Sequence, residues 1–171
     1  KGLFKDVPAN YTYVKELEFL TNNKYITGYT DGTFRPTQTL SRAHGAVIIA
    51  RVLGLDTTNI ENPKFNDVPT THTYYKEIAA AANAGIIGGF EGNFNPSGNL
   101  TRAQMAKMIV KAFELVGESD KIFTDVDPAH WSVPFIQTLV FNNVTTGYTD
   151  GTFKPNEPIT RMHYGLFLYR V

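Results

Sequence analysis

The sequence predicts a mainly α-helical protein made of three tandem helix-loop-helix repeats. Three observations support this class: a segment that recurs at a fixed period, a second marker that opens each repeat, and apolar runs of helical period. The recurring segment reads GYTDGTFRPTQTLSR at 28–42, GGFEGNFNPSGNLTR at 88–102 and GYTDGTFKPNEPITR at 147–161. Its steps are 60 and 59 residues, measured from Arg42 to Arg102 to Arg161. Such a period indicates stacked copies of one supersecondary unit.

The marker that opens each repeat is Phe-x-Asp-Val, which begins at Phe4, Phe65 and Phe123. With the recurring segment it divides the chain into repeats 1–59, 60–118 and 119–171. A unit of about 55 residues is marginal as an independent domain, whereas 171 residues suffice for one good core. We therefore expect a single fused domain over residues 1–171.

The first helix of each repeat is expected to be short and to follow the Phe-x-Asp-Val turn. Its apolar positions are Val14, Leu17 and Leu20 in the first repeat, Tyr75, Ile78 and Ala82 in the second, and Ile136, Leu139 and Val140 in the third. Pro134 suits a first helical turn, because a missing N–H costs no helical hydrogen bond there.

A turn-rich loop follows each first helix. Asp31-Gly32 and Asp150-Gly151 are tight-turn dipeptides between short apolar stretches, which predicts small hairpins. In each repeat a proline follows this turn, at Pro36, Pro96 and Pro155.

The second helix of each repeat has the clearest signals. Ser41, Thr101 and Thr160 precede apolar-periodic runs and are predicted N-caps. Gln104 follows Thr101 by three residues, which completes a capping box. We expect Gly54 and Gly117 to end the first two of these helices.

Composition excludes several classes of function. Sixteen basic and sixteen acidic side chains give a formal charge of zero, which argues against nucleic-acid binding. There is no cysteine for disulfides or thiolate zinc sites, and the four histidines lack metal-ligand spacing. No apolar run reaches transmembrane length, so we expect no membrane insertion. We expect the chain to be a fragment of a longer protein, with any export signal outside it.

These repeats closely resemble the S-layer homology (SLH) module, in three tandem copies that cover essentially the whole chain. The resemblance rests on Phe-x-Asp-Val-Pro, on Gly-Tyr-Thr-Asp-Gly-Thr-Phe and on the final Thr-Arg. It implies a pseudo-threefold assembly with one helix per copy in a central three-helix bundle. It also implies non-covalent anchoring of a bacterial surface or S-layer protein to secondary cell-wall polysaccharide, commonly through a pyruvate-ketal N-acetylmannosamine, with no cofactor.

The chain departs from the family pattern at two places. The usual Thr-Arg-Ala-Glu becomes Ser-Arg-Ala-His, Thr-Arg-Ala-Gln and Thr-Arg-Met-His at 41–44, 101–104 and 160–163. The second copy reads Gly-Gly-Phe-Glu-Gly-Asn from Gly88, where the other copies have Gly-Tyr-Thr-Asp-Gly-Thr. We therefore expect the loops of copies one and three to dominate binding, and Arg42 and Arg161 to matter more than Arg102.

The candidate ligand-binding residues belong to the loops and to the starts of the second helices. Arg42, Arg102 and Arg161 follow the N-caps, where free N–H groups and the helix dipole favour a carboxylate. Replacing Arg42 or Arg161 with alanine is expected to weaken binding clearly with little change in melting temperature, and replacing Arg102 is expected to matter less. The other candidates are of four kinds. Acidic side chains could accept hydrogen bonds from sugar hydroxyls, glycines could let the backbone approach the ligand closely, aromatic rings could pack against the apolar face of a sugar, and further basic side chains could add positive charge. These are Asp31, Glu91, Asp150, Gly28, Gly32, Gly147, Gly151, Tyr29, Tyr148, Trp131, Arg35 and Lys154.

Structural roles compete with these assignments. Asp31 and Asp150 suit a plain turn, Trp131 suits packing near a helix start, and Phe34, Phe94 and Phe153 suit the core. Two other classes of protein also remain open, a protein-binding or assembly scaffold and a glycan-degrading enzyme. The acidic residues recur with the repeat, however, instead of forming one asymmetric pair, and no catalytic motif is present. We therefore predict a binding module that is not an enzyme.

Overall fold

The computed structural model describes residues 3–171 and contains six helices, with no strand in this part of the chain. The helices are α1 Val14–Asn22, α2 Arg42–Leu53, α3 Tyr75–Asn83, α4 Arg102–Phe113, α5 Val133–Phe141 and α6 Arg161–Arg170. The prediction of a mainly α-helical chain of three helix-loop-helix repeats is confirmed. The hairpins expected at Asp31-Gly32 and Asp150-Gly151 are short turns without strands, and an isolated bridge across a turn, from Phe90 to Asn93, forms in the second repeat.

The N-caps of the second helices are confirmed. The hydroxyls of Ser41, Thr101 and Thr160 each accept a hydrogen bond of 3.1 Å from the backbone N–H three residues later. Gln104 completes the capping box by accepting from the N–H of Thr101 at 3.0 Å. These caps form as predicted because they depend only on local sequence.

One helix end is as predicted and the other is not. Gly54 ends α2 in the left-handed conformation, with φ of 62°. Gly117 does not end α4, because Glu114 takes the left-handed cap at φ 51° and its N–H donates to the carbonyl of Val110. The helix therefore closes three residues before the predicted glycine.

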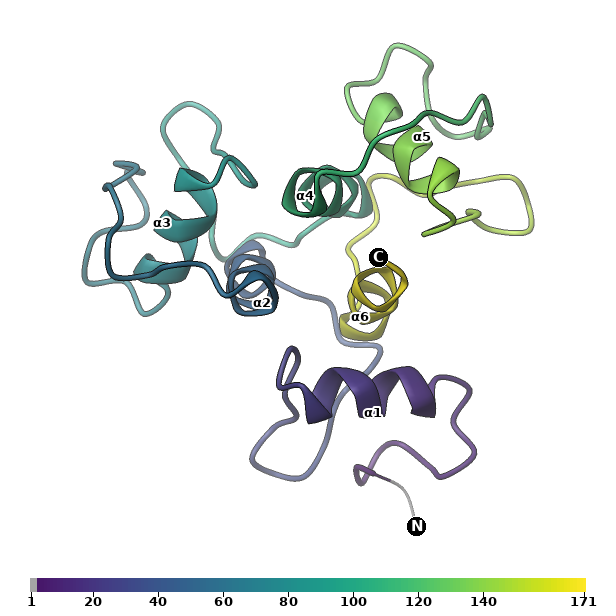
Figure 1. Cartoon of the computed structure of the whole chain (residues 1–171), viewed down its shortest axis with the longest axis horizontal. Coiled ribbons are helices and arrows are strands. Elements are labelled where there is room, and N and C mark those ends of the chain that lie inside the picture. Colours follow the sequence, from purple (N-terminus) through teal and green to yellow (C-terminus); the bar gives the residue numbers. More distant parts are fainter. Residues whose placement is uncertain (1–2) are drawn as a thin grey trace.

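The helices form two layers, as Figure 1 shows. The second helices α2, α4 and α6 lie together at the centre, and α1, α3 and α5 lie outside them. Each outer helix packs on a central helix of another repeat: α3 on α2, α5 on α4, and α1 on α6. The last pair joins the first repeat to the third.

A cycle of backbone hydrogen bonds connects the three repeats just before the central helices. The N–H of Leu40 donates to the carbonyl of Ile159 at 3.1 Å, Ile159 donates to Leu100 at 2.8 Å, and Leu100 donates to Leu40 at 2.9 Å. The side chains of these three residues are buried in the core. The pseudo-threefold relation of the repeats stays a prediction, which this closed cycle supports.

Between the central helices, Tyr164 of α6 is fully buried and its hydroxyl donates to the carbonyl of Gly45 in α2 at 2.9 Å. Burial raises the pKa of this phenol above its ordinary value, so the hydroxyl stays protonated and can donate. In the part of the chain that the structure describes, no helix has the length and hydrophobicity of a membrane span.

Candidate functional site

Each central helix begins against the loop of a different repeat. We define the first loop as 27–38, the second as 88–98 and the third as 146–157, and we name each junction after its loop. The first junction receives Arg161, the second Arg42 and the third Arg102. Every junction therefore combines an arginine from one repeat with a loop from the next.

The helix N-termini are occupied by protein groups. In the second junction the N–H of Arg42 donates to the carbonyl of Gly98 at 2.8 Å, and the N–H of Ala43 donates to the carbonyl of Pro96 at 3.0 Å. The other two helices repeat this pattern, and the N-cap hydroxyls take the next N–H. The expectation that free N–H groups bind an anion here is therefore wrong, and the arginine side chains carry the positive charge of the junction.

Backbone carbonyls hold these arginine side chains in place. The Nε atom of Arg161 donates to the carbonyl of Phe34 at 2.9 Å, and Nη2 donates to that of Thr27 at 2.7 Å. Arg42 makes the same two bonds, to Phe94 at 2.8 Å and Gly88 at 3.0 Å. A guanidinium held this way is fixed in position before any ligand arrives.

Two of these arginines are buried without a carboxylate partner. Arg102 is 5% exposed and Arg161 is 7% exposed. Within residues 3–171 the only ion pairs join Arg35 to Asp31 and Lys154 to Glu157. Burial lowers the pKa of both guanidinium groups from the ordinary value, yet an arginine remains charged at neutral pH. Buried charges are normally paired, so these cations suit an incoming anion.

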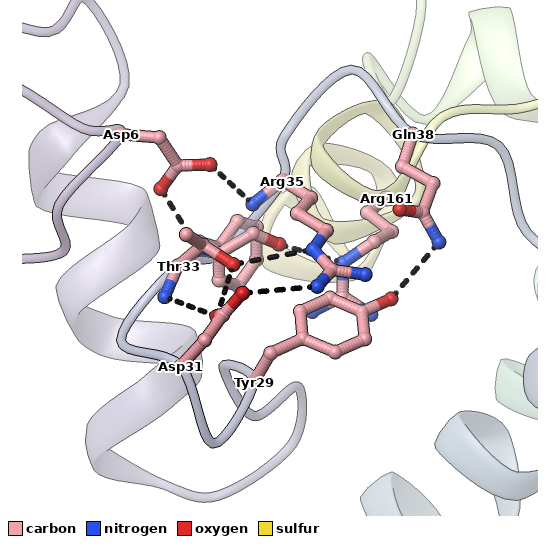
Figure 2. A network of polar contacts seen from close by, with 8 residues as sticks. Asp6, Tyr29, Asp31, Thr33, Arg35, Gln38 and Arg161 are labelled. Atoms are coloured by element: carbon pink, nitrogen blue, oxygen red, sulfur yellow. Dashed lines mark hydrogen bonds and ion pairs between the residues drawn. The ribbon is translucent and has the colours of Figure 1, made fainter.

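The first junction places two cations on one aromatic ring. The guanidinium carbon of Arg35 lies 3.8 Å from the centroid of Tyr29, and that of Arg161 lies 4.8 Å from it. Figure 2 shows Arg35 between this ring and Asp31, with Gln38 bonded to the tyrosine hydroxyl at 3.1 Å. The candidate residues Tyr29, Asp31, Arg35 and Arg161 are therefore brought together.

The carboxylate of Asp31 is engaged by its own turn. One oxygen accepts from the side chain and the backbone N–H of Thr33, at 2.6 and 3.0 Å, and the other accepts from Arg35 at 3.1 Å. The hydroxyl of Thr33, its backbone N–H and then Arg35 lower the pKa of Asp31 to about 2. Asp150 makes the same turn with Thr152. Both aspartates therefore stabilise their own turns by accepting hydrogen bonds from the threonine two residues later.

The third junction has the same composition and a small cavity. Lys154 Nζ lies 4.3 Å and the Arg102 guanidinium carbon 4.9 Å from the centroid of Tyr148. The cavity has a volume of about 200 Å³, and its lining includes Arg102, Tyr148, His163 and Arg170. Burial, followed by the charge of Arg102, lowers the pKa of His163, so this histidine is neutral at pH 7.

The expected ranking of the arginines stays a prediction, but this pairing removes one of its premises. Arg102 belongs to the well-formed third loop, whereas Arg42 belongs to the divergent second loop. The repeat that supplies an arginine is not the repeat that supplies its loop. Arg161 and Arg102 therefore lie in the first and third junctions, whose loops have similar sequences. Arg42 lies in the second junction, whose loop differs from the other two.

The candidate glycines have structural roles in their loops, and their contact with a ligand stays a prediction. A Cβ atom on Gly28 would lie 2.3 Å from the ring of Phe4, and one on Gly147 would lie 2.2 Å from the ring of Phe123. The phenylalanine that opens each repeat thus fills the space beside this glycine. Gly32 and Gly151 have φ values of 87° and 85° inside their turns, where a side chain would be strained.

Sequence reasoning missed the role of the aspartates in the Phe-x-Asp-Val marker. The two oxygens of Asp6 accept from the N–H groups of Phe34 and Arg35 at 2.9 and 2.8 Å. Asp67 and Asp125 do the same in the other loops. This bond holds Arg35 at a φ of 59°, and Asn95 and Lys154 have matching values. The recurrence of this aspartate 27 or 28 residues before the loop phenylalanine in every repeat was the available signal.

The second junction is wider than the third. Its cavity has a volume of about 850 Å³ and is lined by Arg42, Phe90, Glu91, Lys107 and Trp131, among others. Trp131 is half exposed and comes from the third repeat. The structure thus brings Glu91 and Trp131 together with Arg42. Sequence reasoning missed Lys107 and Phe90.

Comparison with known proteins agrees with this architecture. The model of the S-layer homology domain matches residues 3–44, 64–106 and 122–164, which is most of the chain and one match per repeat. The chain belongs to the S-layer homology domain family.

Relatives of this S-layer homology domain are larger surface proteins. It is 33% identical to S-layer protein EA1 of Bacillus anthracis over 96% of this chain and 19% of that protein. It is 32% identical to a cellulosome-anchoring protein of Acetivibrio thermocellus, over 80% and 33%. It is also 36% identical to an uncharacterized cell wall amidase of Bacillus anthracis, over 94% and 30%.

The chain therefore spans about a fifth to a third of the length of these relatives. The predictions of the family and of a cell-surface location are confirmed. In the described residues no group of three or more histidine, aspartate or glutamate side chains is placed to hold a metal ion.

Proposed function

We propose that this S-layer homology domain anchors its parent protein to the cell wall by binding secondary cell-wall polysaccharide non-covalently. Its relatives include S-layer proteins and a cellulosome-anchoring protein, whose names state surface and anchoring roles. The parent protein that the domain attaches is a separate question, because the chain covers a minor part of each relative.

We further propose that the first and third junctions recognise a sugar bearing a carboxylate, such as a pyruvate-ketal N-acetylmannosamine. The observation that carries this proposal is the pair of buried guanidinium groups, Arg161 and Arg102, that have no carboxylate partner in the described chain. An arginine presents a planar set of donors that fits a carboxylate. In the described chain the Arg102 side chain donates one hydrogen bond, from Nε to the carbonyl of Phe153, so both of its Nη atoms are available to a carboxylate.

The neighbouring groups support the same ligand. Tyr29 and Tyr148 present ring edges and hydroxyls beside the arginines, and Arg35 and Lys154 add positive charge. The cavity of the third junction has room for about one sugar residue, being smaller than the range of about 300–1,000 Å³ that is common for larger ligands. Such a site suits a terminal sugar of the polymer.

Calorimetry with a pyruvylated wall glycan and with the same glycan after removal of pyruvate tests this proposal. Loss of one charged hydrogen bond weakens binding roughly tenfold to a hundredfold, so we expect at least this loss without pyruvate. Lys154→Gln should weaken binding of the pyruvylated glycan and increase the salt tolerance of what remains. Arg51→Gln, at an exposed position in α2, is the matched control.

Equal affinity for both glycans would overturn the carboxylate proposal and leave wall anchoring intact. If the domain bound neither glycan, the anchoring proposal itself would fail, and the scaffold alternative would be preferred. Shortening of the glycan during the titration would instead reveal an enzyme.

A further inference from the structure

The second loop differs from the other two by one residue. Asp67 lies 27 residues before its partner Phe94, whereas Asp6 and Asp125 each lie 28 residues before theirs. The residue is missing from the turn of the second loop. Tyr29 bonds to Thr33 across a three-residue turn, but Phe90 and Asn93 bond to each other at 2.8 and 3.0 Å across two residues.

This deletion changes which residues correspond. A Cβ atom on Gly89 would meet the ring of Phe65, as one on Gly28 would meet Phe4, so Gly89 and not Gly88 is the counterpart of Gly28. Phe90 is then the counterpart of Tyr29. The sequence comparison, aligned on the arginines, placed these residues one position apart. The two turn residues Glu91 and Gly92 have φ values of 51° and 83°, as a type I′ turn requires.

The shorter turn leaves Arg42 uncovered. All three junction arginines lie over a core phenylalanine ring, with Arg42 4.6 Å from Phe94 and the other two at 4.7 Å. Arg161 and Arg102 also have a tyrosine ring, of Tyr29 at 4.8 Å and of Tyr148 at 4.9 Å, whereas in the described chain no second ring lies over Arg42. Phe90 is 78% exposed and lines the cavity. The position of Arg35 and Lys154 is taken by Asn95, so the second cation on the loop is missing as well.

The resulting cavity has walls of a different kind. Phe90 of the second repeat and Trp131 of the third repeat both line it, and both are at least half exposed. Aromatic faces of this sort pack against the apolar face of a sugar ring. Arg42 and Lys107 are balanced by Glu91 and Asp67, so the lining has no net charge.

The volume indicates the length of the ligand. About 850 Å³ falls within the range of about 300–1,000 Å³ that accommodates a complete larger ligand, while the third junction falls below that range. We propose that the second junction binds an uncharged, interior stretch of about two or three sugar residues of the wall polysaccharide, held between Phe90 and Trp131. The inference rests on the proposed function but assigns this junction a different part of the polymer.

Trp131 reports occupancy of this cavity directly, because it is the single tryptophan of the chain. The whole 171-residue chain is titrated with wall polysaccharide from which pyruvate has been removed, and with its oligosaccharide fragments. We expect a saturable change in tryptophan fluorescence that depends on fragment length and is insensitive to salt. Phe90→Ala should weaken this binding about threefold to tenfold, as loss of one aromatic contact does.

Phe141→Ala is the matched control, because Phe141 is also an exposed phenylalanine but lies outside the cavity. Calorimetry with the pyruvylated terminal sugar runs in parallel, and Phe90→Ala should leave this affinity unchanged. If the terminal sugar binds but the depyruvylated polymer leaves Trp131 fluorescence unchanged, the inference is wrong and the proposed function stands. A fluorescence response only to the pyruvylated sugar, weakened by salt, would also overturn it. If no wall glycan binds in either assay, the proposed function and this inference fail together.

Discussion

Replacing Arg161 with alanine should destabilise the domain as well as weaken binding. The side chain is 7% exposed and donates to the carbonyls of Phe34 and Thr27, at 2.9 and 2.7 Å. Each hydrogen bond to a charged group contributes roughly 1.5–3 kcal/mol. Water can enter the vacated site and donate to the two carbonyl oxygens that Arg161 leaves without a partner. We therefore expect a loss of about 3 kcal/mol in the free energy of unfolding, at the lower end of the sum for two such bonds.

For a chain of this size, 1 kcal/mol corresponds to about 2–4 °C in Tm. Arg161→Ala should therefore lower the Tm by about 6–12 °C. Thermal unfolding is followed by circular dichroism and calorimetry, with Arg51→Ala as a control at an exposed arginine of α2. A Tm for Arg161→Ala equal to that of the control would refute the reasoning and restore the expectation that this arginine acts on the ligand alone.

Three more predictions concern the core and the histidines. Deleting 119–171 breaks the hydrogen-bond cycle, so calorimetry should show no cooperative transition; a sharp melt near the wild-type temperature would contradict the single fused domain. Tyr164→Phe leaves the Gly45 carbonyl without its donor, and chemical denaturation should register a loss of about 1–3 kcal/mol. Burial lowers the pKa values of His44 and His163 below 6.5, so the unfolded chain takes up protons first as the pH falls. The stability that the neutral histidines provide above pH 6.5 should be lost as the pH falls through their folded pKa values, and the double variant His44→Gln, His163→Gln should flatten this dependence in melts between pH 7 and pH 5.

Features that depend on neighbouring residues could be predicted from the sequence. The capping residues Ser41, Thr101 and Thr160 act on an N–H three residues away, so their pattern is visible in any short window. Gly117 failed as a helix stop because Glu114 already adopted the left-handed conformation.

The composition of the junctions could not be predicted in the same way. Arg161 and Phe34 are 127 residues apart, and no local pattern tells which loop an arginine will reach. The shift in the second loop was hidden because an alignment on the arginines pairs Gly88 with Gly28. Counting from Asp67 to Phe94 would have revealed the missing residue.

The packing of α1 on α6 has a consequence for the order in which the molecule forms. The pairs α2 with α3 and α4 with α5 join neighbouring repeats and can assemble as the chain lengthens. The first junction cannot form before Arg161 is available. It joins two residues, Phe34 and Arg161, that are 127 positions apart in the chain, and bringing such distant residues together carries a large entropic cost. We therefore expect this junction to form last, so that a chain still emerging from an export channel holds its second and third junctions before it completes its first.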